Sequence, residues 1–362
     1  MWSVSDAFLR ALPQSHSLAY SCTLTTPGGV STSLLLSPGS TVNAQAGQTI
    51  RRTASLQVAG GTALFKQLSA PGATVSLRYG IDFGGGSTEL VPQIKGKLSK
   101  AATQLGDGLL GVSLADDGAQ IQATPFLTTY SPASTAGRIA TVTAAVQGGV
   151  SGVSVSNLAS DSATLGAVQT WTSREQLIQS LLTDAGAEGF FLPDGSYRIR
   201  DLPAVTDDPV WTFTTGPGGT IENLSRERPL DKLYNTVVVQ PANLDASQTW
   251  TQAIAQITDT TNPRHPNYIN VRPYVWQSPT IMSVTEAQAV AGKILAKLQG
   301  STDTISLGAV SNPALEPGDV IRAITPTDDG FEIVQHLVNA FSLDIFSGSM
   351  SLQTQSAAEA FA

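Results

Sequence analysis

The sequence is poor in cysteine and in long apolar runs. Of its 362 residues one is a cysteine, Cys22, so no disulfide can form within the chain and no zinc site can be built from clustered thiolates. A cytosolic folding environment fits this cysteine usage. No apolar stretch approaches the roughly 20 residues that a membrane-spanning helix needs. Because Asp6 and Arg10 also interrupt any apolar signal-peptide core, we expect neither a membrane anchor nor a cleaved leader.

Charge is scarce as well, and no basic run occurs. Charged residues make up 13% of the chain, against roughly 25% in a typical soluble domain. The 28 acidic residues outnumber the 20 basic ones, which gives a formal net charge of -8. Sequence-specific nucleic-acid binding is therefore not expected. A surface with so few charges indicates either large areas covered by partners or a β-rich secreted or capsid-type domain with many Ser, Thr and Gly residues.

Catalytic constellations are missing too. Glycoside hydrolysis needs two separated carboxylates, whereas the acidic pairs here are adjacent residues at turns, which we expect to point into water: Asp116-Asp117, Asp207-Asp208 and Asp328-Asp329. The histidines lie far apart in the sequence, without a His-Glu-x-x-His helix: His16, His265 and His336. No Gly-x-Ser-x-Gly elbow occurs. We assign no catalytic, cofactor-binding or metal-binding residue, and predict that the protein is not an enzyme.

What the sequence does contain is short strands separated by turns. Between residues 18 and 125 they alternate with Gly-rich and Pro-rich turns, a spacing typical of an antiparallel sandwich or barrel. Gly84–Gly86 lacks the Lys-Ser/Thr of a phosphate-binding loop, so we predict a hairpin tip. From Val210 strands return, and Thr236–Val239 is the most strongly β-forming run.

Helical periodicity interrupts this pattern twice. Ser173–Gln176 is a capping box that leads into an amphipathic helix ending at Gly186, and Pro193–Ser196 predicts a hairpin turn after it. A second capping box, Ser283–Glu286, opens a helix over 284–299, whose apolar face, with Ile294, we expect on the outer wall of the second β domain. We expect Lys293 and Lys297 on that helix to face solvent or a neighbouring subunit.

These patterns predict a mainly β protein with an α+β insert. Two antiparallel β-barrel or sandwich domains flank a small α/β domain, with the divisions 1–125, 126–205 and 206–362. Pro317-Gly318-Asp319 reads as a turn before a strand of the last domain, since Pro fixes the entry and Gly supplies a positive φ.

Several segments resemble tail proteins encoded by actinobacterial phages: Val4–Leu12 with Ser15-His16, Ile50–Thr53, Leu233–Val239, Asn312–Ile321, His336–Val338 and Met350–Leu352. Together they are similar to the hub family of tailed phages and contractile injection systems. The resemblance implies two tail-tube-like barrels in each chain and a homotrimer whose six barrels match a sixfold tube. No motif of that family occurs in the insert or in residues 243–273, so the resemblance implies no partner for them.

What the resemblance implies about function is a structural hub of a tail tip or baseplate. It would join the hexameric tail tube, or a distal tail protein, to the tip, a central spike or a tape-measure protein. It implies a virion component made in the host bacterial cytoplasm, without cofactors. The alternative is a receptor-binding or carbohydrate-binding tail module, in which Tyr268, Tyr274 and Trp276 would stack on sugar rings, although aromatics in a strand more often pack a core.

Overall fold

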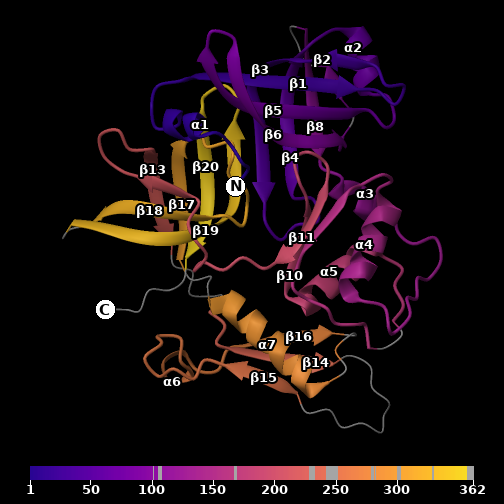
Figure 1. Cartoon of the computed structure of the whole chain (residues 1–362), viewed down its shortest axis with the longest axis vertical. Helices are drawn as coiled ribbons and strands as arrows, with labels where there is room; N and C mark the ends of the chain where they lie inside the picture. Colours follow the sequence, from indigo (N-terminus) through magenta and orange to yellow (C-terminus); the bar gives the residue numbers. More distant parts are fainter. Residues whose placement is uncertain are drawn as a thin grey trace.

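The structure, a computed structural model, describes residues 1–100, 102–104, 108–166, 169–227, 233–241, 252–278, 281, 283–299, 303–327 and 330–356. Within these residues the strands form one 14-stranded sheet and two three-stranded sheets (Figure 1). The prediction of a mainly β fold is therefore confirmed. Among the helices described, none combines the length and the apolar character needed to cross a membrane.

The first β region begins after helix α1 (Asp6–Ala11) and also holds helix α2 (Thr62–Leu68). Its strands are β1 (Ser17–Thr25), β2 (Ser31–Ser33), β3 (Leu35–Gln45), β4 (Arg52–Ala59), β5 (Thr74–Gly84), β6 (Ser87–Leu98), β7 (Thr103–Gln104) and β8 (Leu109–Ala115). Their order in the sheet is β3-β4-β8-β6-β5-β1-β2, antiparallel throughout. Every second residue of β4 is buried, as expected of a strand with one face on a core.

The first β region curls back toward its own beginning. β2 pairs with β1 at one end of the path, and only Leu34 separates it from β3 at the other end. The amide of Leu34 donates to the carbonyl of Cys22 at 2.8 Å. Among the described residues, β2 and β3 nevertheless do not pair with each other, so the strands form no complete barrel. Between β5 and β6, Gly84, Gly85 and Gly86 all have positive φ, which confirms the predicted hairpin tip.

The second β region contains β12 (Trp211–Thr214), β13 (Ile221–Glu227), β17 (Asp303–Val310), β18 (Val320–Thr327), β19 (Gly330–Asp344) and β20 (Ser349–Ser356). Their order is β13-β17-β20-β19-β18-β12, and only the last pair, β18 and β12, is parallel. The first five strands repeat the arrangement β3-β4-β8-β6-β5 of the first region, because the chain passes through both sets in the same order. The fold is an internal duplication.

The two copies also agree in register. The pair Thr53↔Ala115 corresponds to Thr304↔Gln355, and this alignment matches β4 with β17 from end to end. The same alignment makes Thr74 and Val320, the first residues of β5 and β18, equivalent to each other. They pair with Lys97 and Leu337, which are equivalent as well. The matched strands read RTASLQVA in β4 and DTISLGAV in β17, with three identical positions. The pairing with β8 is interrupted after Leu98, and the pairing of β19 with β20 shifts register after Val338. These two positions are equivalent in the two copies.

A strand pairing joins the two regions into one sheet. The end of β19 pairs antiparallel with β3, from Ala340↔Gln45 to Asp344↔Thr41. Val42, Phe341 and Leu343 are buried there, in a hydrophobic core that contains residues of both regions. The two β regions therefore behave as one packed unit.

The insert, between the two regions, consists of α3 (Gly118–Ala123), α4 (Arg138–Gly149), β9 (Val155–Leu158), α5 (Arg174–Ala185), β10 (Ala187–Phe191) and β11 (Tyr197–Asp201). Its sheet has the order β10-β11-β9, and its core is separate. The capping box is confirmed, since Ser173 Oγ accepts from the amide of Gln176 at 3.3 Å, and Gly186 ends α5 with a φ of 65°. Gly195 lies in the predicted hairpin turn with a φ of 90°.

A further module consists of β14 (Thr236–Pro241), β15 (Ala253–Gln256), α6 (Pro266–Ile269), β16 (Pro273–Ser278) and α7 (Val284–Gln299). Its sheet has the order β15-β14-β16, and α7 packs on β14 and β15 around a core of its own. The expectation that this helix covers the wall of the second β region was wrong, because the strongly β-forming run Thr236–Val239 builds a separate sheet beneath it. The division of the chain at residues 125 and 205 stays a prediction.

Candidate functional site

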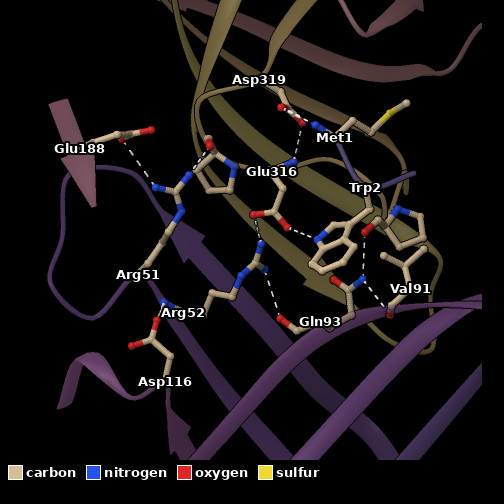
Figure 2. Close-up of polar contacts among 12 residues, drawn as sticks. Met1, Trp2, Arg51, Arg52, Val91, Gln93, Asp116, Glu188, Glu316 and Asp319 are labelled. Carbon is tan, nitrogen blue, oxygen red and sulfur yellow. Dashed lines mark hydrogen bonds and ion pairs between the residues drawn. The ribbon is translucent and has the colours of Figure 1, made fainter. Parts of the chain in front are cut away.

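The most elaborate polar arrangement lies where the two β regions, the insert and the N-terminal segment meet (Figure 2). We call it the polar junction and define it by Arg51, Arg52, Glu188, Glu316 and Asp319. The side chains of Arg51 and Arg52 are each 1% exposed. Buried charges are costly unless they are paired, so their partners decide what this place can do.

Arg52 joins the two β regions. It is the first residue of β4, and its Nη2 forms an ion pair with Oε2 of Glu316 in the loop before β18. Its Nη1 donates to the carbonyl of Gln93 at 3.2 Å, and the guanidinium lies 5.5 Å from the ring centre of Phe341. The contacts of a single side chain therefore connect β4, β6, β19 and the loop before β18.

Arg51 connects the β regions to the insert. Its Nη1 lies 3.7 Å from Oε2 of Glu188 on β10, and its guanidinium stacks 3.6 Å from the ring centre of Phe190. The guanidinium also donates to the carbonyl of Pro317. Burial lowers the pKa of Arg51 to about 10, while Glu188 opposes that shift, so the group stays charged at neutral pH. Glu188 in turn pairs with Arg200 of β11 at 2.7 Å.

The predicted turn at Pro317-Gly318-Asp319 is confirmed, with a φ of 86° at Gly318. Asp319 accepts from the amide of Glu316 at 2.8 Å and from the Met1 ammonium at 2.6 Å. Burial raises the pKa of the Asp319 carboxyl, while the ammonium opposes that shift. The indole nitrogen of Trp2 donates to Oε1 of Glu316 at 2.6 Å. Arg200 of the insert donates to the carbonyl of Pro317 at 3.3 Å. The loop is thus in contact with the N-terminal segment, with β4 and with the insert.

The acidic pairs behave differently from one another. Asp116 is buried, against the expectation that it points into water, because it accepts from the amides of Arg52 at 2.7 Å and Gly118 at 2.9 Å. Burial raises its pKa to about 6. Asp207 is exposed and accepts from the amide of Ala204 at 3.0 Å, and Asp208 is exposed beside it. The pair at 328 and 329 lies outside the described residues.

The three histidines lie in separate parts of the fold. His16 Nδ1 lies 2.8 Å from the carbonyl of Gln14, His265 accepts from the amide of Asn267 at 3.2 Å as the N-cap of α6, and His336 is buried in β19. Within the described ranges, no group of three or more His, Cys, Asp or Glu side chains could hold a metal ion. That the protein has no catalytic or metal site stays a prediction.

The three aromatic residues proposed to bind sugar do not form one platform. Tyr274 and Trp276 are half-buried against the core of their own module. Tyr274 lies 5.5 Å, centre to centre, from Tyr234, and the indole of Trp276 donates to Asp184 of α5 at 3.3 Å. Only Tyr268 is largely exposed, at 65%. Tyr274 and Trp276 thus pack against a core, as expected of aromatic residues in a strand.

Trp276 also marks a contact between the further module and the insert. Nζ of Lys293 on α7 donates to the carbonyl of Ala185 at 2.9 Å, and Arg138 of α4 pairs with Glu286 of α7. Lys293 therefore faces the insert rather than solvent or another subunit. Nothing is described of the Lys297 side chain. Sequence patterns carried no signal for these contacts, since each joins residues far apart in the chain.

In the large sheet, several strands pair with only one other strand among the described residues, and β13 and β7 are two of them. β13 pairs with β17 alone, and all its residues from Glu222 to Glu227 are exposed. β7 pairs with β8 alone, and both its residues are exposed. Edge strands of a sheet can in general pair with another chain.

Comparisons with known proteins agree with this architecture. A family described as putative phage tail protein matches residues 173–336 by sequence. Among curated proteins, no sequence matches the chain.

Solved structures match nearly the whole chain. A tail protein from Neisseria meningitidis is 13% identical, with a TM-score of 0.63 over 93% of this chain and 96% of that one. The 43 kDa tail protein of prophage MuSo2 from Shewanella oneidensis is 11% identical, with a TM-score of 0.61 over 92% and 98%. A type VI secretion component of E. coli, described as structurally similar to bacteriophage T4 tail proteins, is 9% identical, with a TM-score of 0.51 over 93% and 78%. The resemblance to phage tail proteins, in sequence over residues 173–336 and in fold over the chain, is confirmed.

Proposed function

We propose that this chain is a non-enzymatic hub protein of a phage tail tip or baseplate, in which three copies form a ring around a central channel. The ring joins the hexameric tail tube, or a distal tail protein, to the tip, a central spike or a tape-measure protein, and it continues the DNA channel. The protein is made in the bacterial cytoplasm and acts in the virion.

One observation carries this proposal: the register-matched duplication of the β regions within a single sheet. A threefold ring that docks on a sixfold tube has to offer six similar surfaces. Two copies of one fold in each chain supply them, since three chains then carry six copies. The polar junction supports the same role, because it holds the insert and the N-terminal segment at fixed positions against both copies.

Electrostatic repulsion does not prevent such a ring. Each chain carries a formal charge of -8, so three chains sum to 3 × -8 = -24. At physiological salt the Debye length is about 8 Å, so charges dispersed over a wide ring are largely screened. An acidic channel wall would also keep DNA from adhering as it passes.

The subunit count in an assembled tail tests the proposal. A cryo-EM map of the tail should show three copies around the axis, with the two β regions alternating. Any other number of copies contradicts it. A hub should not bind host wall polysaccharides on a glycan array. Such binding would favour the alternative function as a receptor-binding module.

A further inference from the structure

The further module is joined to the second β region at one place. The chain leaves the large sheet after β13 and returns to it at β17, and these two strands pair with each other. The pair Glu227↔Thr304 places the exit and the return side by side. In Figure 1 the module lies at the lower end of the molecule, below the insert. A part whose two connections are adjacent can rotate about them while the strands stay in place.

The module has a hydrophobic core of its own. The apolar face of α7 covers β14 and β15, with Val290, Ala291 and Leu295 in this core. Within the described chain, the core of the insert and the core of the module contain no side chain of each other. The two β regions, by contrast, share one core. Movement of the module away from the insert would therefore divide no apolar core.

Two polar contacts hold the module at the C-terminal end of α5. Nζ of Lys293 donates to the carbonyl of Ala185 at 2.9 Å, and a cation is favourable there because the end of a helix carries partial negative charge. A Cβ atom at Gly186 would lie 2.5 Å from Cδ of Lys293, so the lysine chain lies directly on the residue that ends α5. The indole of Trp276 donates to Oδ1 of Asp184 at 3.3 Å.

A third contact joins α7 to α4, where Arg138 pairs with Glu286. The Arg138 side chain is 2% exposed, so the loss of every acidic partner would oppose a separation. Nη1 of Arg138, however, also lies 3.9 Å from Oδ1 of Asp161 in the insert. Asp161 stays with Arg138 when the module leaves, whereas Glu286, already 28% exposed, gains water. The pair between the two parts is therefore replaceable.

The module also forms one wall of a cleft. This cleft of about 1200 Å³ lies between the module, the insert and strands β19 and β20. Arg264, Trp276 and Lys293 line it from the module, while α5, β10 and the segment 201–206 line it on the other side. The separation between module and insert therefore determines how far the cleft is open.

We infer that the further module is a hinged arm, which pivots at the paired ends of β13 and β17 and closes the cleft through its polar contacts with α4 and α5. Opening exchanges these contacts for water and leaves both cores intact. It requires no change inside the module, so the arm moves as one rigid body. The inference concerns a single chain and is independent of the number of copies in an assembly.

Distances between spin labels test the arm. Ala144 on α4 and Ile254 on β15 are exposed, so A144C/I254C places one label on the insert and one on the module. Native Cys22 is buried and burial raises its pKa to about 12, so it should stay unlabelled. At low salt, pulsed EPR should give one narrow distance distribution. In about 1 M salt, where the Debye length falls to about 3 Å, the mean distance should increase by more than the width of that distribution.

Substitution of the contacts should have the same effect at low salt. E286Q/K293Q removes one charge of each sign, so the net charge does not change. Glutamine at position 286 also suits the capping box, in which the amide of that residue donates to Ser283. The matched control is D259N, which removes a charge whose hydrogen bonds come from Thr261 of the module itself. This control should leave the distance between the labels unchanged.

A second pair of labels, within the module, tests whether it moves as a rigid body. Gly292 on α7 has open space where a Cβ atom would lie, so a label at this position should not disturb the packing. The I254C/G292C distance should be the same with native contacts, in E286Q/K293Q and at high salt. A change in this distance would show that the module itself unfolds, and would overturn the inference.

Two further outcomes would also overturn it. An A144C/I254C distance that stays narrow and unchanged in E286Q/K293Q and at high salt would show that the module is fixed to the insert. A shift of equal size in D259N would show that the effect does not belong to these contacts. None of these results bears on the subunit count that tests the proposed hub.

Discussion

Arg51 and Arg52 are neighbours in the chain, but different parts of the molecule hold their side chains. Adjacent residues at the start of a strand point to opposite faces, so Arg51 reaches Glu188 of the insert while Arg52 reaches Glu316 of the second β region. Each charge is buried against a carboxylate, and removal of one partner leaves the other without compensation. Arg52, the first residue of β4, and Arg51 just before it thereby connect three parts of the fold.

Glu316→Gln should destabilise the protein strongly. The substitution leaves the buried guanidinium of Arg52 without its carboxylate, which typically costs about 3–5 kcal/mol of unfolding free energy. Urea unfolding followed by tryptophan fluorescence measures it. The control is Glu332→Gln, which breaks the exposed pair with Arg226 and should cost at most about 1 kcal/mol. Equal losses in the two variants would contradict the role assigned to Glu316.

Asp116→Asn should change the pH dependence of stability. Burial raises the folded-state pKa of Asp116 from 3.8 to about 6, so the folded chain holds this proton more tightly than the unfolded chain does. The stabilisation is complete below the unfolded pKa and is lost as pH rises through about 6. A shift of about two units corresponds to about 3 kcal/mol.

The measurement compares both proteins by urea unfolding across that pH range. The native chain should lose about 3 kcal/mol more than Asp116→Asn between about pH 3.5 and about pH 7. Because every other titrating group is common to the two proteins, the difference reports Asp116 alone. Parallel curves would show that the carboxyl titrates normally in the fold.

At the scale of elements, helix α7 illustrates how local pattern and tertiary position separate. Its capping box is present, since Ser283 Oγ accepts from the amide of Glu286 at 3.1 Å, and its apolar residues Val290, Ala291 and Leu295 are buried. The sequence shows which face is apolar, but not which sheet the face covers. Here the sheet is β15-β14-β16.

Leu295→Ala should destabilise the further module by about 2–5 kcal/mol, because it opens a cavity between α7 and its sheet. Ile294→Ala should cost less, since Ile294 is only half-buried against that core. The matched control is Val284→Ala, at the exposed start of the helix, expected within about 0.5 kcal/mol of the native chain. Thermal unfolding by calorimetry gives all three values. A neutral Leu295→Ala would mean that α7 is not packed on β14 and β15.

Local features were predictable from the sequence, whereas long-range contacts were not. Turns such as Gly84–Gly86 and helix starts such as Ser173 depend on residues within one turn of chain, so their patterns predicted them. The partner of Arg52 is 264 residues away, and no local pattern points to it. The separate sheet under α7 was missed for the same reason, because β14 and β16 are both short strands and are far apart in sequence.

At the scale of the whole molecule, the duplication is hard to see in the sequence. The two copies share their strand order and pairing register, whereas few of their residues are identical. The match between β4 and β17 includes Thr53, Ser55 and Leu56 against Thr304, Ser306 and Leu307. Such a short match is not distinctive. The strand order and the paired positions reveal the repeat, since they fix the same places in both copies.

Purified protein should release neither sugars nor peptides from actinobacterial cell walls. The buried carboxylates of the polar junction are paired with arginines or with the N-terminal ammonium of the same chain, an arrangement that leaves them no role as acid or base toward a substrate. A zymogram measures clearing, with lysozyme as the positive control. Clearing that persists through repurification would contradict a purely structural function.

The pairing of β3 with β19 also affects how a ring would depend on protein supply. Within each chain this contact forms during folding, because the tether keeps the two regions at a high effective concentration however dilute the protein is. In a ring of three chains, half of the region-to-region contacts are therefore insensitive to dilution. Only three bodies have to meet instead of six, which lowers the reaction order of assembly. The ring can then complete at expression levels at which six separate subunits would stay apart.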